Sequence, residues 1–275
     1  MRKILAVSGG IDSVVLLHLF KDEKPIVAHF DHGIRANSSE DANFVEKLAN
    51  EYGLEFECRR EELGENCSEA IARKKRYEFF AELAQKYDGV IYVAHHADDV
   101  IESIVINLLR GTGWRGLAPM NSKNIERPLL EWSKRDIYKY ATENSLVFRQ
   151  DQTNTEGNYL RNKIREKLRF LSEETKKKIL EIYQKQSNLY NECDELLGEI
   201  IQNDGGYYSK DVIENSSDDC AMEIIRYVLS LNNISLTRPQ LQRCVEAIRH
   251  YSPMKRLSLG RANFLEVGKY SYRVI

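Results

Sequence analysis

The amino-acid sequence predicts an α/β fold: a doubly wound, parallel sheet of the five-stranded type, followed by a smaller, mainly helical domain. Short apolar runs alternate with helical patterns over the first half of the chain, which is typical of a parallel sheet covered by helices on both faces. A glycine pair joins the first run to the first helix. After residue 110 the alternation stops, and a long charged helical pattern leads into a second region.

The predicted elements follow in order along the chain, with helices that begin at capping residues and end at glycine or polar loops. The strands are expected at residues 4–7, 26–30, 54–58 and 90–94. The helices are expected at 12–20, at 38–53, from 68, at 98–109, after Ser133, at 159–169, at 172–201, near Ser216 and after Thr237, with short strands at the C-terminus. We therefore expect two domains, residues 1–171 and 172–275.

Composition limits the class of protein. The 275 residues are 42% hydrophobic, which suffices for one full core and a smaller one. The mean hydropathy is −0.50, and no apolar run approaches a membrane span or a signal-peptide core, so we expect a soluble protein without a membrane partner. The five cysteines form no C-x-x-C pair, which argues against disulfide, zinc-ribbon and iron–sulfur frameworks and suits a reducing cytoplasm. With a net charge of −2, nucleic-acid binding would need local basic patches.

A hexapeptide between the first strand and the first helix carries the clearest chemical signal. It reads Ser8-Gly9-Gly10-Ile11-Asp12-Ser13. Glycines let backbone N–H groups approach an oxyanion, and the helix N-terminus adds partial positive charge. The lysine of the usual G-x-x-x-x-G-K-[ST] loop is missing, so amides, hydroxyls and a metal would hold phosphate, with Asp12 as a magnesium ligand. The alternative is an ordinary tight strand–helix turn.

Further polar residues follow the other predicted strands. Because ligands gather outside the carboxyl ends of parallel strands, we expect Ser8, His32 and His95 to meet in one crevice. Asp99 and Glu102 share a helix face and could hold magnesium, an ammonium group, or both; the alternative is a pair of acids stabilised by the helix dipole.

The histidines His32, His95 and His96 fit no compact zinc signature. We expect His95 to contact nucleotide or to orient Asp99, and His96 to be a structural histidine.

Two basic helices are candidates for anion binding. Residues 159–169 carry recurring cations, with Tyr159 available to stack on an unpaired base; the alternative is a surface helix with snorkelling side chains. Arg73 and Arg76 lie on an earlier helix, where the alternative is a solvated basic face.

The motifs together resemble those of the N-type ATP pyrophosphatases, the PP-loop superfamily. The hexapeptide looks like the pyrophosphate loop of that superfamily but cannot choose among its members. An ordered series of further motifs is similar to the tRNA(Ile)-lysidine synthetases and spans most of residues 4–169. The series is Phe30-Asp31-His32-Gly33-Ile34-Arg35, Glu69-Ala70-x-Ala72-Arg73-x-x-Arg76-Tyr77, Ala94-His95-His96-Ala97-Asp98-Asp99-x-x-Glu102, Arg110-Gly111-x-Gly113-x-x-Gly116-Leu117, Arg127-Pro128-Leu129-Leu130, Asp151-x-x-Asn154 and Arg161-Asn162-x-Ile164-Arg165.

The resemblance implies an adenine nucleotide alpha hydrolase-like fold and a cytoplasmic ligase that uses ATP and Mg²⁺. In its reaction the C2 oxygen of a tRNA cytidine attacks the α-phosphate of ATP, and the amine of L-lysine then displaces AMP. The tRNA implied is the isoleucine acceptor with a CAU anticodon. The chain resembles the family's short form, in which residues 172–275 are expected to be a connector helix and a small tRNA-binding domain. Rejection of the methionine tRNA and assembly into a homodimer are left open.

The motifs and the resemblance also assign expected roles. The expected catalytic residues are Asp12, Asp99 and Arg76, and the metal ligands are Asp12 and Asp99. ATP is assigned to Ser8, Gly9, Gly10, Ile11, Asp12, Ser13, His32 and His95. L-lysine is assigned to Asp99 and Glu102. The tRNA is assigned to Arg110, Gly111, Asn154, Arg161, Asn162 and Arg165.

Two alternatives from other classes are kept. A tRNA-sulfurating enzyme of the same superfamily shares the adenylation step but needs reactive cysteines, often in spaced pairs, which this chain lacks. A non-catalytic nucleotide-binding module does not explain Asp12, Asp99 and Glu102 together.

Overall fold

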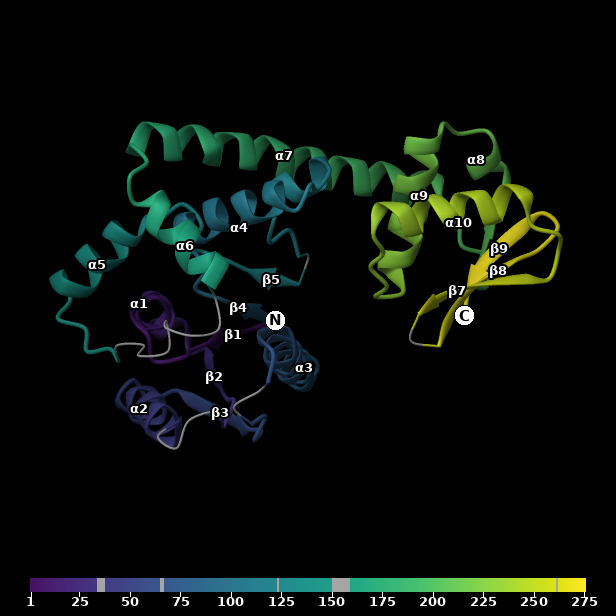
Figure 1. The fold of residues 1–275 in the computed structure, drawn as a ribbon. Coiled ribbons are helices and arrows are strands. Elements are labelled where there is room, and N and C mark those ends of the chain that lie inside the picture. The colour runs from purple at the N-terminus through teal and green to yellow at the C-terminus, as the bar shows by residue number, and fades with distance from the viewer. Residues whose placement is uncertain (34–37, 65–66, 123, 150–158, 261) are drawn as a thin grey trace. The chain divides into compact units, whose positions relative to one another are not determined.

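The computed structural model describes residues 1–33, 38–64, 67–122, 124–149, 159–260 and 262–275. They divide into two compact units, Met1–Ser187 and Asn188–Ile275, which Figure 1 colours from purple to yellow along the chain. The boundary between the units falls inside helix α7 (Glu173–Ile200). The sequence-based boundary at residue 171 lies before that helix, and the role of the second unit in binding tRNA stays a prediction.

The first unit is built on a parallel sheet of five strands in the order β3-β2-β1-β4-β5, which confirms the predicted fold class. The strands are β1 (Arg2–Ala6), β2 (Ile26–Asp31), β3 (Glu55–Arg60), β4 (Gly89–Tyr92) and β5 (Ile125–Glu126). The helices are α1 (Ile11–Phe20), α2 (Ser38–Glu51), α3 (Glu69–Tyr87), α4 (Ala97–Leu109), α5 (Lys134–Glu143), α6 (Tyr159–Leu168) and most of α7, with 3₁₀ turns at Lys21–Glu23 and Trp114–Leu117. The sequence did not reveal β5, because two residues produce no periodicity.

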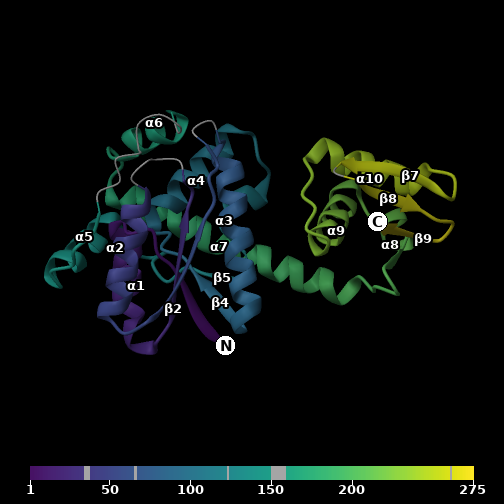
Figure 2. The same ribbon diagram turned by 90° about the horizontal axis from the view of Figure 1, so that it is seen from below.

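Helices cover both faces of this sheet (Figure 2). Strand β2 is buried throughout, as expected of a central parallel strand. Its side chains alternate between the faces: Ile26 packs with Phe79 and Phe80 of α3, whereas Val27 packs with Leu17 of α1 and Val45 of α2. Burial on both faces therefore leaves the strand ends as the place for polar chemistry.

The order of the strands reverses beside β1, which pairs with β2 on one side and with β4 on the other. In open α/β sheets, ligands bind outside the carboxyl ends of the strands at such a switch point. The glycine-rich hexapeptide follows β1, and the segment with His95 and His96 follows β4. The topology thus brings these two segments to one edge of the sheet.

The second unit combines three helices, the end of α7 and an antiparallel sheet of four strands in the order β6-β9-β8-β7. Its elements are β6 (Tyr207–Ser209), α8 (Asp211–Glu214), α9 (Asp218–Leu231), α10 (Arg238–His250), β7 (Lys255–Gly260), β8 (Asn263–Val267) and β9 (Ser271–Val274). Ile225, Leu241 and Leu265 are buried in one core between helices and sheet. In the part of the chain that the structure describes, no helix has the length and apolar character to cross a membrane.

Candidate functional site

The turn between β1 and α1 is organised from within by a buried serine. The Ser13 hydroxyl accepts hydrogen bonds from the backbone N–H groups of Ser8 (3.1 Å) and Gly9 (3.2 Å) and donates one to the carbonyl of Gly10 (2.9 Å). Ile11 is buried in the core shared with α5, so its side chain anchors the turn and only its backbone is offered to a ligand. Ser13 therefore shapes the loop that the sequence assigned to ATP.

Gly9 provides a test of that shape. Its φ of +91° lies in the region that favours glycine, and a Cβ there would lie 3.3 Å from Phe44 Cδ1. We expect Gly9→Ala to lower stability by about 1–2 kcal/mol and to weaken ATP binding, measured by thermal melting and calorimetry. Gly53→Ala is the matched control, because Gly53 has φ +62° with open space around it; it should cost stability alone. Unchanged ATP affinity in Gly9→Ala would show that the loop tolerates this distortion.

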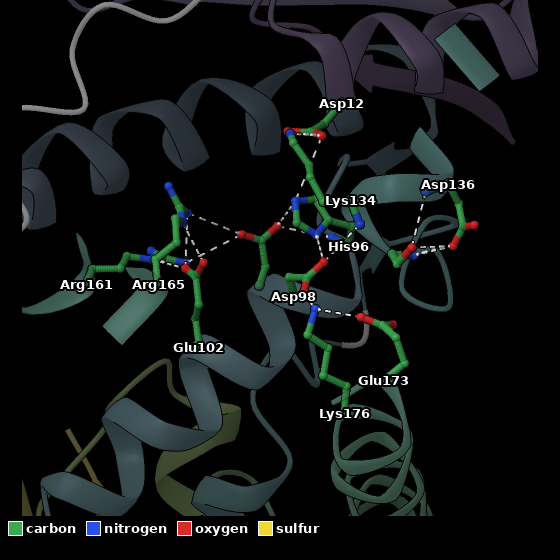
Figure 3. A network of polar contacts seen from close by, with 12 residues as sticks. Asp12, His96, Asp98, Glu102, Lys134, Asp136, Arg161, Arg165, Glu173 and Lys176 are labelled. Atoms are coloured by element: carbon green, nitrogen blue, oxygen red, sulfur yellow. Dashed lines mark hydrogen bonds and ion pairs between the residues drawn. The ribbon is translucent and has the colours of Figure 1, made fainter. Parts of the chain in front are cut away.

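Carboxylates from the first turns of α1 and α4 converge on His96, the N-cap of α4 (Figure 3). His96 is buried, and its Nε2 lies 3.5 Å from Asp99 Oδ2 and 3.9 Å from Asp12 Oδ1. Its Nδ1 lies 3.9 Å from Asp98 Oδ2 and has no hydrogen-bond partner among the described residues. The structure thus places His96, rather than His95, against Asp99.

The predicted metal ligands Asp12 and Asp99 face the same imidazole nitrogen. Carboxylate oxygens suit Mg²⁺, which proteins usually bind through one or two carboxylates together with phosphate and water. Within the described ranges, no group of three or more His, Cys, Asp or Glu side chains could hold a metal ion. The pair therefore fits an ion that arrives with phosphates better than a cage made by protein alone.

A lysine that the sequence analysis did not select lies at the same point. Lys134 donates to Asp12 Oδ1 (Figure 3). It begins α5 directly after the N-cap Ser133, and its backbone N–H donates to Asp98 Oδ2 at 2.9 Å. Lys176 of α7 holds the other oxygen of Asp98 at 3.0 Å. Lys134 therefore brings a positive charge to the hexapeptide at residues 8–13, which contains no lysine.

His32 and His95 both lie in a cationic environment. Arg127 Nε is 3.3 Å from His95 Nδ1. Burial and the charges of Arg127, Arg73 and Arg76 lower the pKa of His95 to about 3. Burial and the charge of Arg76 lower the pKa of His32 to about 4. Both imidazoles are therefore neutral near pH 7, and Arg76 acts on the loops after both β2 and β4.

The lowered pKa of His95 predicts a pH-dependent contribution to stability. Between pH 3 and 6.5 the unfolded chain carries a proton on this residue that the folded chain lacks, so the unfolding free energy falls as the pH drops through this window. His95→Asn should remove up to about 1.4 kcal/mol per pH unit of that slope, measured by urea unfolding at several pH values. The exposed His250→Asn is the control, and equal slopes in both variants would contradict the expectation.

Glu102 does not face an open crevice. It is 2% exposed, and its carboxylate accepts hydrogen bonds from Arg161 Nε (3.1 Å), Arg165 Nε (2.6 Å) and Arg165 Nη2 (3.1 Å). The same arginines lie 3.9 Å and 4.0 Å from Asp99 Oδ1. Residues that the sequence analysis assigned separately to lysine and to tRNA therefore form one cluster of ion pairs.

Other residues assigned to tRNA lie elsewhere. Arg110 and Gly111 are exposed beyond the C-terminal end of α4, about 16 Å along that helix from Asp99 at 1.5 Å per residue. Asn162 is half-buried on α6. Asn154 lies outside the described residues. Their roles in binding tRNA stay predictions.

Comparisons with known proteins identify the family of the first unit's sequence. Residues 1–171 match the family described as the PP-loop domain. The tRNA(Ile)-lysidine synthase of Thermotoga maritima is 36% identical over 180 residues, covering 60% of this chain and 44% of that protein. That of Geobacter sulfurreducens is 39% identical over 184 residues, covering 61% and 39%. The matched part is thus less than half the length of either relative.

Among solved structures, the chain is similar to a U34-tRNA thiolase from Methanococcus maripaludis that contains a [4Fe-4S] cluster. The TM-score is 0.58 at 18% identity, with 68% of this chain and 72% of that chain covered. At this identity the likeness concerns the fold.

Proposed function

The chain belongs to the PP-loop domain family, and from this premise we propose that it is a ligase that joins L-lysine to a tRNA cytidine at the expense of ATP. The proposed tRNA is the isoleucine acceptor with a CAU anticodon, and the proposed product is lysidine, with AMP and pyrophosphate released. The lysidine synthases among its relatives support this choice of reaction. A cytoplasmic location and assembly into a homodimer stay predictions.

One observation supports the proposal above the others: Asp12 and Asp99, from the first turns of α1 and α4, face one point beside a glycine-rich helix N-terminus. A nucleotide whose phosphates lie on the loop amides would place its α-phosphate near these carboxylates. Mg²⁺ bound there would neutralise charge on the phosphates as pyrophosphate departs. Two carboxylates at this point fit metal-assisted cleavage of ATP.

The first half-reaction uses the loop and its neighbouring cation. The cytidine C2 oxygen attacks the α-phosphate, and the bond to pyrophosphate breaks. We assign the backbone N–H groups of Ile11 and Asp12, at the N-terminus of α1, to the phosphates. Lys134 is assigned to the negative charge that develops on the leaving group. Neutral His32 and His95 can hydrogen-bond the nucleotide without adding charge.

The second half-reaction needs a lysine amine that is held in place and has lost its proton. We assign Asp99 and Glu102 to the ammonium group, and Asp99, the more accessible of the two, to removal of its proton. The free amine then attacks C2, and AMP leaves. Arg76 would stabilise the negative charge of the adenylate from α3.

The sulfur-transfer alternative gains no support from the cysteines. Reactive cysteines have a lowered pKa, whereas burial raises the pKa of the Cys58 thiol and raises that of Cys244 to about 11. No disulfide joins the cysteines in the part of the chain that the structure describes. Cys244 is buried and fits a packing residue better than a sulfur carrier.

Incubation of the protein with ATP, Mg²⁺, labelled L-lysine and total tRNA tests the proposal. Nucleoside mass analysis should find a cytidine enlarged by one lysine less one water, and only when ATP is present. Formation of a thiolated nucleoside in a parallel reaction with a sulfur donor would favour the alternative. The proposed ligase would be refuted if no label from L-lysine entered the tRNA when ATP and a tRNA with the CAU anticodon were both supplied.

A further inference from the structure

Two arginines of α6 occupy the carboxylates that we assign to lysine. Glu102 accepts three hydrogen bonds from Arg161 and Arg165 and is almost fully buried beneath them (Figure 3). Asp99 lies within 4.0 Å of both guanidinium groups. In this conformation the cations of the chain itself fill the place of the substrate ammonium.

We propose that tRNA opens the lysine site by drawing Arg161 and Arg165 onto its phosphates, so that tRNA binding raises the affinity for lysine. This inference rests on the proposed function and sets the order in which its substrates enter.

Glu102 has little capacity left for a second cation. An ionised carboxylate offers about four acceptor positions, and three of them are used. A lysine ammonium entering now would also meet two guanidinium groups of the same charge. Lysine therefore binds well only after at least one arginine has moved.

The arginines are able to move without unfolding the helix. Their side chains are 27% and 39% exposed, whereas Ile164, between them, is buried and anchors α6. Guanidinium groups match the geometry of phosphate and form bidentate hydrogen bonds with it. A change of side-chain rotamer therefore suffices, with the backbone of α6 left in place.

The buried carboxylate makes the two binding events cooperative. A buried charge that loses its partner is strongly unfavourable. The free energy of tRNA binding is therefore weakened if both arginines move to phosphates while Glu102 stays without a partner. The lysine ammonium supplies the replacement cation. Because coupling between two ligands is reciprocal, lysine must raise the affinity for tRNA by the same factor.

Equilibrium dialysis of radiolabelled L-lysine against the full chain, without ATP, tests the coupling. A transcript of the isoleucine tRNA with a CAU anticodon should strengthen lysine binding by about 5- to 150-fold, the usual range of such coupling. Saturating lysine should strengthen binding of the transcript by the same factor, measured by filter binding. Both measurements use the unchanged protein.

The double substitution Arg161→Gln with Arg165→Gln should bind lysine without tRNA more tightly than the unchanged chain does, and should lose the enhancement by tRNA. Lys178→Gln, an exposed cation of α7 paired with Glu174, should keep it. If the double variant does not fold, the reciprocal measurement in the unchanged chain decides.

Equal lysine affinity with and without the transcript, in a chain that still makes lysidine, would overturn the inference and leave the proposed function standing. A chain that makes no lysidine at all would overturn the proposed function, and the inference with it.

Discussion

Replacing Asp12 with alanine is expected to lower tRNA-dependent pyrophosphate release by at least about 100-fold, while the protein stays folded. Loss of one group that stabilises charge in a transition state typically costs 10²–10³ in rate. Asp12 is partly exposed at the start of α1, so its removal leaves no cavity in the core. The variant also leaves Lys134 without its ion-pair partner. The role of the lysine therefore needs its own substitution, Lys134→Gln.

The measurement is release of labelled pyrophosphate at saturating tRNA across a range of Mg²⁺ concentrations. Asp22→Ala is a suitable control, because Asp22 is an exposed acid just after the same helix. It should retain full activity. A rate for Asp12→Ala within threefold of the control would exclude Asp12 as a metal ligand or charge-stabilising group.

Much of the fold is predictable because the signals that specify it are local. The apolar run that becomes β2 bounds that strand to within one residue at each end. The pattern that becomes α3 places the start of that helix to within one residue, at its N-cap Ser68. The hexapeptide before α1 combines three signals, a strand end, a glycine pair and a helix start. The two-residue β5 (Ile125–Glu126), the three-residue β6 and the four-residue α8 were too short to leave such a pattern and were not expected from the sequence.

The contacts inside the site were less predictable because they join distant residues. Lys134 lies 122 positions from Asp12, and Arg161 lies 59 positions from Glu102. In sequence, Lys134 is one of many lysines, and only its position after a capping serine marks the start of a helix. The choice between His95 and His96 depended on which imidazole the chain turns inward at the N-cap of α4, which helical periodicity does not determine.

Two roles for Lys134, holding phosphate or neutralising Asp12, predict opposite results when Lys134 is substituted. If Lys134 holds phosphate during adenylation, Lys134→Gln should lower kcat/KM for ATP by about 10- to 150-fold, which corresponds to the 1.5–3 kcal/mol of a hydrogen bond to a charged group. If Lys134 only neutralises Asp12, the substitution should free that carboxylate for Mg²⁺. The Mg²⁺ requirement would then fall and ATP binding would not weaken.

We expect Lys134→Gln to lower kcat/KM for ATP. The hexapeptide lacks the lysine of other phosphate-binding loops, and Lys134 brings a cation to its Asp12. Initial rates of pyrophosphate release, measured over a grid of ATP and Mg²⁺ concentrations, distinguish the two. Lys134→Arg should recover part of the activity, since charge is kept although the geometry differs. Lys139→Gln is the matched control, an exposed lysine on the same helix, and should behave as the unchanged chain. A lowered Mg²⁺ requirement with an unchanged KM for ATP in Lys134→Gln would remove Lys134 from the phosphate site and leave it as the partner of Asp12 alone.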